Sequence, residues 1–338
     1  MSRDYTLHTS KTPSGPRIDY QAELNEQQYA AVTAPPGQTL VIAGAGSGKT
    51  RTLTYRVAWL LDNGVLPEQI LLLTFTNKAA REMLERVTAL VPVDTRRLWS
   101  GTFHSIGNKL LRWNAECLGY RKGFSIMDRE DQKDLMETVV TASGIDTGGF
   151  RFPKAEVLGD IYSMADNTGT PLPRLIKERY PHFEKVAEHI IRLRELYQNK
   201  KVETNCMDFD DLLTQSVRLL KENQDLSERY REQFEFVLVD EYQDTNSLQC
   251  EFVELLTGKD GNLMVVGDDA QSIYSWRGAD VTNILNFHEH WPKARSHKIE
   301  VNYRSVPEVL ALANASIANN KAQIRKNLQP ARPAKDQL

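Results

Sequence analysis

Short apolar runs recur along the chain, each bounded by polar or turn-forming residues. They lie at residues 39–44, 70–75, 236–241, 263–268 and 298–302. Runs of this length without an alternation of polar positions are typical of strands buried on both faces, as in a parallel sheet.

The segments between these runs have the spacing of amphipathic helices. Apolar residues fall at i, i+4, i+7 and i+8 in the first of them, where Asn63 and Gly64 supply a stop. The residues that show such spacing are Leu53, Val57, Leu60 and Leu61, then Met83, Val87 and Leu90, then Leu248, Phe252 and Leu255. Strands alternating with helices predict an α/β fold, with a doubly wound parallel sheet flanked by helices.

The pattern also divides the chain. Residues 1–22 are polar and predict a flexible arm, and strand runs are missing between residues 106 and 207, where helical periods dominate. We therefore expect a mainly helical domain at 106–207, inserted into a discontinuous α/β domain made of residues 23–105 and 208–300. Residues 301–338 are expected to begin a further domain.

Composition narrows the class of protein but does not indicate a ligand. Charged residues make up 26% of the chain and hydrophobic ones 41%, and the net charge is −3. This is a globular composition without the strong positive charge of a protein that coats nucleic acid, so any DNA contact must be a local patch. No apolar run approaches the ~18 residues of a membrane span, and the N-terminus does not resemble a secretory signal. A cytoplasmic location follows by default.

The cysteines give no sign of a metal site. Cys117, Cys206 and Cys250 lie far apart in the sequence, and no Cys-x-x-Cys pair occurs. Such spacing argues against a zinc site or an iron–sulfur cluster, and a sparse, odd count suits a reducing compartment.

A glycine-rich segment follows the first apolar run and precedes a helical pattern, which is the context of a phosphate-binding loop. Backbone N–H groups of such a loop and the helix N-terminus would surround ATP phosphates. Lys49 would reach the β- and γ-phosphates, and the Thr50 hydroxyl would hold Mg²⁺. The usual first glycine is replaced by Ala43, and a plain strand-to-helix turn is the alternative. The segment consists of Ala43, Gly44, Ala45, Gly46, Ser47, Gly48, Lys49 and Thr50.

Two acidic residues end the apolar run at 236–241. Asp240 would lie near the Mg²⁺ ion, and Glu241 would polarise the water that attacks the γ-phosphate. An acidic pair after a strand can equally be a solvated strand end, but a phosphate loop in the same chain favours the catalytic interpretation.

Several longer motifs make the chain resemble the UvrD/Rep/PcrA family of superfamily 1 DNA helicases, which implies a RecA-like P-loop domain. The motif at 266–279, with the sequence Val-Gly-Asp-Asp-Ala-Gln-Ser-Ile-Tyr-Ser-Trp-Arg-Gly-Ala, is the most distinctive. The remaining matches are at residues 24–28 with 30–32, 43–51, 73–80, 101–105, 240–244 and 301–305.

The resemblance implies a role for individual residues. Gln28 would read adenine, Tyr303 would stack on it, and Arg51 would follow the phosphate loop. Gln271 would couple the γ-phosphate to the DNA site, and Arg304 would act as an arginine finger. A single-strand path would be lined by Phe75, Asn77, His104, Tyr274, Trp276 and Arg277.

Aromatic faces stack on any base, so a path of this kind would hold DNA without reading its sequence. Each aromatic residue of this set could instead serve ordinary core packing. Trp276 and Phe75 could pack in the core, the latter because it ends an apolar strand. His104 could make a structural hydrogen bond instead of a DNA contact.

The expected activity is therefore that of an ATP- and Mg²⁺-dependent motor on single-stranded DNA or its junctions with duplex. The family implies 3′ to 5′ movement, and its later motifs would lie beyond residue 338, so we expect an N-terminal portion with a truncated second motor domain. Two alternatives stay open. One is the motor part of a helicase–nuclease subunit, and the other is a non-catalytic, nucleotide-dependent DNA-binding module.

Overall fold

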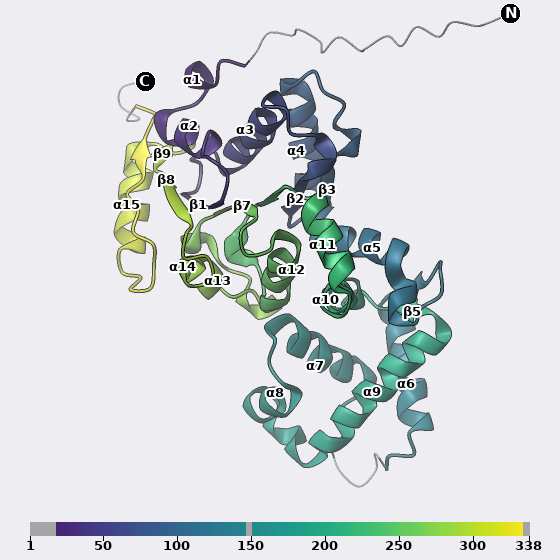
Figure 1. The fold of residues 1–338 in the computed structure, drawn as a ribbon. Helices are drawn as coiled ribbons and strands as arrows, with labels where there is room; N and C mark the ends of the chain where they lie inside the picture. Colours follow the sequence, from purple (N-terminus) through teal and green to yellow (C-terminus); the bar gives the residue numbers. More distant parts are fainter. Residues whose placement is uncertain (1–17, 147–150, 334–338) are drawn as a thin grey trace, which may run out of the picture.

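The computed structural model describes residues 18–146 and 151–333, and within them a parallel sheet lies at the centre of the larger lobe (Figure 1). Its strand order is β3-β2-β6-β7-β1-β8, with all neighbours parallel. The predicted α/β fold with a parallel sheet is confirmed. The strands are β1 (Gln38–Ala43), β2 (Ile70–Thr74), β3 (Trp99–Thr102), β6 (Phe236–Val239), β7 (Asn262–Gly267) and β8 (Arg295–Ile299).

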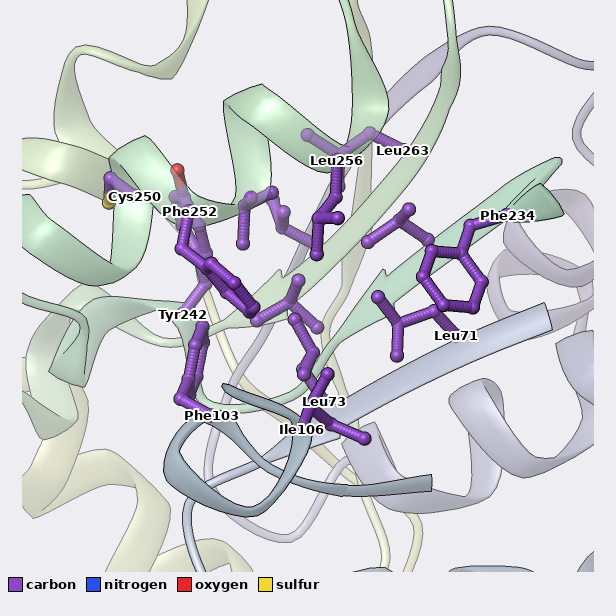
Figure 2. Close-up of a cluster of buried hydrophobic side chains, with 14 of the residues drawn as sticks. Leu71, Leu73, Phe103, Ile106, Phe234, Tyr242, Cys250, Phe252, Leu256 and Leu263 are labelled. Atoms are coloured by element: carbon purple, nitrogen blue, oxygen red, sulfur yellow. The ribbon is translucent and has the colours of Figure 1, made fainter. Parts of the chain in front are cut away.

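Helices cover both faces of this sheet, and the mainly apolar strands β1, β2, β6 and β7 direct alternate side chains into two cores. Leu71 and Leu73 of β2 face one core, which is drawn in Figure 2, and Ile70 and Leu72 face the other. The first core is closed by α5 (Phe103–Asn114), α10 (Asp211–Glu222), α11 (Gln224–Gln233), α12 (Ser247–Thr257), α13 (Thr282–Leu285) and α14 (Phe287–His290). The second is closed by α2 (Glu26–Val32), α3 (Lys49–Asp62) and α4 (Asn77–Leu90), which the short α1 (Tyr20–Glu23) precedes.

The helical region has a core of its own (Figure 1). It consists of α6 (Arg129–Ala142), α7 (Ala155–Thr168), α8 (Leu172–Arg179) and α9 (Ala187–Thr204), with a small ladder of β4 (Ser125–Ile126) and β5 (Cys206–Met207). The helical region was expected to begin at residue 106, within α5. Ile106 and Leu110 of α5 pack in the sheet's first core, because α5 lies against β3 and α10. The exact domain limits stay a prediction.

The last part of the chain returns to the sheet. After β8 the chain forms β9 (Val301–Asn302), then α15 (Pro307–Ile317), and finally β10 (Gln329–Pro330), which pairs with β9 in parallel. Among the described residues no helix is both long and apolar enough to cross a membrane.

Candidate functional site

The sequence motifs that follow strands all leave the sheet at the same edge. In a parallel sheet the carboxyl ends of the strands lie together, and loops that follow them form the ligand-binding crevice. Here β1 leads to the phosphate loop, β6 to Asp240 and Glu241, and β7 to the segment that holds Gln271 and Trp276. The strands β2 and β3 lead to Phe75 and His104 at the other end of the same edge.

The backbone conformation of the predicted phosphate loop depends on its glycines. Gly46 and Gly48 have φ of 74° and 91°, a left-handed conformation that side chains other than glycine rarely adopt. A Cβ on Gly46 would also lie 2.6 Å from the Cβ of Arg304, so the close approach of the chain after β8 requires glycine. Ser47 fixes the turn by donating from its hydroxyl to the Gly44 carbonyl at 2.7 Å.

Gln28 supports the loop from α2. Its side chain is 2% exposed, and Nε2 donates to the Ser47 carbonyl at 2.9 Å while Oε1 accepts from the Asn25 backbone. The amide is therefore already used in positioning the phosphate loop. Nε2 carries a second hydrogen, so contact with adenine stays a prediction.

Glu241 lies directly opposite the loop lysine. Its Oε2 is 3.3 Å from Lys49 Nζ, and the lysine side chain is 9% exposed. The backbone of Glu241 has φ 49° and ψ 44°, a conformation that costs energy for a residue other than glycine or asparagine. Strain of this kind clusters at functional sites, where the surrounding structure holds a side chain in a required direction.

Asp240 and Asp244 complete an acidic group around that lysine. Burial, together with the nearby charge of Glu241, raises the pKa of Asp240 to about 7, although Lys49 acts in the opposite direction. Asp244 has one buried carboxylate oxygen with no hydrogen-bond partner. Among the described residues no group of three or more His, Cys, Asp or Glu side chains could hold a metal ion by itself. The Asp240 carboxylate and the unpartnered Asp244 oxygen are donors of the kind that fits Mg²⁺, which usually keeps several waters and is bound by one or two carboxylates together with substrate phosphates.

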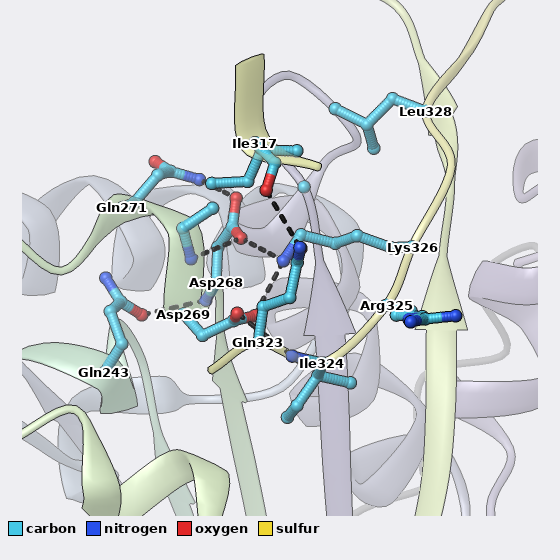
Figure 3. A network of polar contacts seen from close by, with 12 residues as sticks. Gln243, Asp268, Asp269, Gln271, Ile317, Gln323, Ile324, Arg325, Lys326 and Leu328 are labelled. Carbon is cyan, nitrogen blue, oxygen red and sulfur yellow. Dashed lines mark hydrogen bonds and ion pairs between the residues drawn. The ribbon is translucent and has the colours of Figure 1, made fainter. Parts of the chain in front are cut away.

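A chain of side-chain contacts links Glu241 to the motif that follows β7. Gln243 is 1% exposed, and its Nε2 donates to Glu241 Oε2 at 2.9 Å while its Oε1 accepts from the backbone N of Asp268 at 2.9 Å. Asp268 in turn accepts from Nε2 of Gln271. Figure 3 shows Gln243 and Gln271 on opposite sides of Asp268. The predicted catalytic residues Glu241 and Gln271 are thus joined through the side chain of Gln243 and through the backbone N and carboxylate of Asp268.

The chain after β8 brings further predicted residues to the loop. The backbone N of Tyr303 donates to the Gly46 carbonyl at 3.0 Å, and its hydroxyl accepts from Asn25 at 2.8 Å. Tyr303 keeps 44% of its surface exposed, which leaves ring area for stacking. Arg304 is exposed beside Gly46, and Arg51 bonds the Glu23 carbonyl at 2.9 Å and lies over the ring of Tyr55.

The predicted DNA-contact residues differ in exposure. Trp276 is 64% exposed and Tyr274 40%, on the segment around a short 3₁₀ turn at Ser275–Arg277, so neither is a core residue. Asn77 is exposed at the start of α4. Phe75 is partly buried and packs edge-to-face on Phe103 with ring centroids 5.9 Å apart. The side chain of Arg277 lies outside the described part of the chain.

The comparison with known families settles which family this fold and these motifs represent. The family model of the UvrD/REP helicase N-terminal domain matches residues 24–292. The chain belongs to the UvrD/Rep helicase family. The resemblance inferred from the motifs is therefore confirmed, although the role of each site residue stays a prediction.

Curated relatives agree with this assignment. The chain is 41% identical over 317 residues to a protein named ATP-dependent DNA helicase PcrA from Leuconostoc citreum, which covers 93% of the chain and 42% of that relative. Proteins of the same name from Staphylococcus epidermidis and Staphylococcus aureus are 40% identical over 316 and 306 residues, covering 93% and 90% of the chain and 42% and 41% of those relatives. The chain thus spans less than half the length of these relatives.

One exposed aromatic residue that the motifs did not single out lies beside the predicted DNA-contact residue His104. Phe209 is 59% exposed and stacks on His104, with ring centroids 4.1 Å apart and planes 19° apart. Two reciprocal hydrogen bonds between Asp208 and Asp211 shape the turn that presents it, and Lys201 pairs with both carboxylates at 2.8 and 2.6 Å. Its signal in the sequence was an aromatic residue between charged ones, which is common on any surface.

Proposed function

We propose that the chain is the ATP-hydrolysing motor part of a helicase that moves along single-stranded DNA. The observation that supports this most directly is the continuous contact path from Lys49 through Glu241, Gln243 and Asp268 to Gln271. A protein that only binds nucleotide needs the lysine and the loop. A motor must also couple ATP hydrolysis to its contact with DNA. The buried path from Glu241, proposed to activate water, to the segment that carries Trp276 would provide that coupling.

Within this proposal the loop binds the ATP phosphates, and Lys49 places a positive charge on the β- and γ-phosphates. Thr50 and Asp240 would hold Mg²⁺, which would neutralise charge on the phosphate oxygens. Glu241 would accept the proton of the attacking water, and its strained backbone and the bond from Gln243 would aim its carboxylate. Arg304, exposed beside Gly46, would stabilise charge on the transferred phosphoryl group.

The DNA part of the proposal rests on aromatic rings along the carboxyl edge, of which Trp276, Tyr274 and Phe209 are exposed and His104 is partly buried. Trp276, Tyr274 and the His104–Phe209 stack offer flat surfaces to successive bases, each of which can contribute about 1–3 kcal/mol. Such stacking tolerates every base, as a motor requires. Movement in the 3′ to 5′ direction is carried over from the family resemblance alone.

A test measures ATP turnover by residues 1–338 with Mg²⁺, with and without an oligothymidylate. Lys49→Ala should abolish turnover, because no neighbouring side chain can replace a compact positive charge among phosphate oxygens. Lys122→Ala is the matched control, since this lysine is 80% exposed and pairs only with Glu116 among the described ion pairs. If the parent chain hydrolyses ATP and Lys49→Ala is equally fast, the phosphate-loop assignment is refuted.

The same assay distinguishes the second candidate, a non-catalytic nucleotide-dependent DNA-binding module. Such a protein would bind ATP and DNA yet show no turnover above that of Lys49→Ala. The hydrolysis apparatus around Glu241, Gln271 and Arg304 favours the motor, because a binding module needs none of these three residues.

A further inference from the structure

The chain that follows α15 lies against β9 and beside the first residues of the phosphate loop. The backbone N of Gln329 donates to the Glu300 carbonyl at 2.8 Å, and that of Ala331 donates to the Asn302 carbonyl at 2.8 Å. Leu328 lies so close to the loop that a Cβ on Gly44 would be 2.3 Å from its Cδ2. Figure 1 shows this last segment beside β9, next to the strand that leads to the loop.

Lys326 extends from this segment into a pair of adjacent carboxylates. Its Nζ is 2.7 Å from Asp268 Oδ1 and 2.7 Å from Asp269 Oδ1. The lysine side chain is 4% exposed, and the two aspartate side chains are 3% and 1% exposed. The backbone N of Ile324 donates to the second oxygen of Asp269 at 3.1 Å, so the segment is attached at two points (Figure 3).

Electrostatics makes this contact more than a surface ion pair. Two buried carboxylates on consecutive residues repel one another, and each loses hydration, so the arrangement needs a positive charge nearby. Burial acts to lower the pKa of Lys326, but its bonds to Asp268 and Asp269 outweigh burial and raise the pKa above its ordinary value. The lysine therefore stays charged at neutral pH and holds both carboxylates in place.

Asp268 is also the junction between the two residues proposed to act on the γ-phosphate. One of its carboxylate oxygens bonds Lys326 and the other accepts from Gln271 Nε2. Its backbone N donates to Gln243, whose amide donates to Glu241. A shift of Asp268 would therefore move the side chain of Gln271 and, through Gln243, the carboxylate of Glu241.

We infer that Lys326 is a positioning residue for ATP hydrolysis, which fixes Asp268 and thereby the direction of Gln271 and Glu241. The inference rests on the proposed function. It makes docking of the segment after α15 a condition for fast hydrolysis, although Lys326 itself touches no part of the nucleotide in this scheme. Residues in one contact network modulate coupling by factors of about 2–30, and we expect an effect in that range.

The test compares Lys326→Met with the matched control Arg325→Met. Arg325 is the exposed neighbour of the same charge, and Figure 3 shows its side chain directed away from the carboxylate pair. Two quantities are measured on residues 1–338. They are the affinity for a non-hydrolysable ATP analogue with Mg²⁺ and the rate of single-turnover ATP hydrolysis at saturating ATP. Lys326→Met should slow hydrolysis about 10-fold while analogue affinity changes less than about 3-fold, and Arg325→Met should change neither.

A second variant separates positioning from loss of fold. Lys326→Met leaves two buried carboxylates without their lysine, so the variant can lose stability. Adding Asp269→Asn removes one of the two charges and leaves Asp268 with the bond from Gln271. The double variant should therefore fold and bind the analogue as the parent chain does, yet remain slow in hydrolysis, because Asp268 still lacks the bond from Lys326.

The outcomes are distinguishable. If the parent chain hydrolyses ATP and either Lys326→Met or the double variant is as fast, Lys326 has no positioning role. The same conclusion follows if rate and analogue affinity fall together in the double variant. If the parent chain is no faster than Lys49→Ala, the proposed function fails, and the inference fails with it.

Discussion

Trp276 provides the sharpest test of the proposed DNA-binding edge, because the chain contains a second tryptophan in the opposite environment. Trp276 is 64% exposed after β7, whereas Trp291 is 5% exposed in the first core of the sheet. Replacing each by alanine removes the same atoms. The two variants should therefore separate ligand contact from packing.

The expected magnitudes follow from burial. A fully covered aromatic side chain buries roughly 150–250 Å². With about a third of Trp276 covered, roughly 80 Å² at ~25 cal/mol per Å² gives at most about 2 kcal/mol of stability, and this is an upper bound. Trp291→Ala should instead cost about 3–5 kcal/mol. In binding, Trp276→Ala should lose about 1–3 kcal/mol towards single-stranded DNA, which is about 5- to 150-fold in Kd.

The assay combines urea unfolding with fluorescence-anisotropy titration of a labelled oligothymidylate at fixed salt. Salt must be fixed because contacts to phosphate make DNA affinity strongly dependent on ionic strength. A loss of 3 kcal/mol or more in stability for Trp276→Ala, combined with unchanged DNA affinity, would contradict the stacking role. The folded fraction of Trp291→Ala should bind DNA as the parent chain does.

Three further changes have outcomes that the structure specifies. Glu241→Gln should keep ATP-analogue affinity and slow hydrolysis about 10²–10⁴-fold, and collapse of analogue binding would instead make Glu241 structural. Desolvation lowers the pKa of His104 to about 4 from 6.5, so folding favours the neutral ring. The free energy of unfolding should therefore keep this contribution in full above pH 6.5 and fall by about 2 kcal/mol from pH 7 to pH 5, as measured by urea titrations. His104→Gln should reduce that loss. Gly46→Ala should weaken ATP-analogue binding and destabilise the chain more than Gly123→Ala does. Both glycines have positive φ, but only at Gly46 would an added Cβ press against Arg304. Equal losses of stability in the two variants would mean that the close approach of Arg304 to Gly46 is unimportant.

The parallel sheet was predictable because β1, β2, β6 and β7 are buried on both faces along most of their length. Two strands differ. The edge strand β8 has only Ile299 buried and begins before the apolar run at 298–302. In β3, Trp99 and Gly101 are buried and Ser100 and Thr102 are only partly so. Four residues of that kind form no continuous apolar run, and the strand is recognisable only once β2 lies beside it. The conformation of the loop at 43–50 was predictable for a different reason, since a phosphate-binding loop requires glycine at fixed positions next to a lysine, and Gly46 and Gly48 have the positive φ that favours glycine.

Contacts between distant segments were not predictable in the same way. The stack of Phe209 on His104 depends on where the region after β5 meets α5, and no local pattern encodes that meeting. The same holds for Lys326, which lies in a polar stretch that reads as solvated surface until its side chain is seen 4% exposed between two aspartates. Local sequence specifies elements and loop chemistry, whereas a buried ion pair between remote segments is specified by the assembled fold.

That distinction bears on how such a motor would couple its parts. The residues proposed for chemistry, Lys49 and Glu241, belong to motifs whose spacing is set by a single strand and the turn after it. The contact that would report the position of the following domain segment instead crosses from Lys326 to Asp268, over more than fifty residues of chain. A catalytic group fixed by local structure can form whenever the sheet folds, but a positioning contact from a remote segment forms only when that segment docks. Hydrolysis that depends on Lys326 would therefore be sensitive to domain arrangement, whereas nucleotide binding, which depends on the loop, would not.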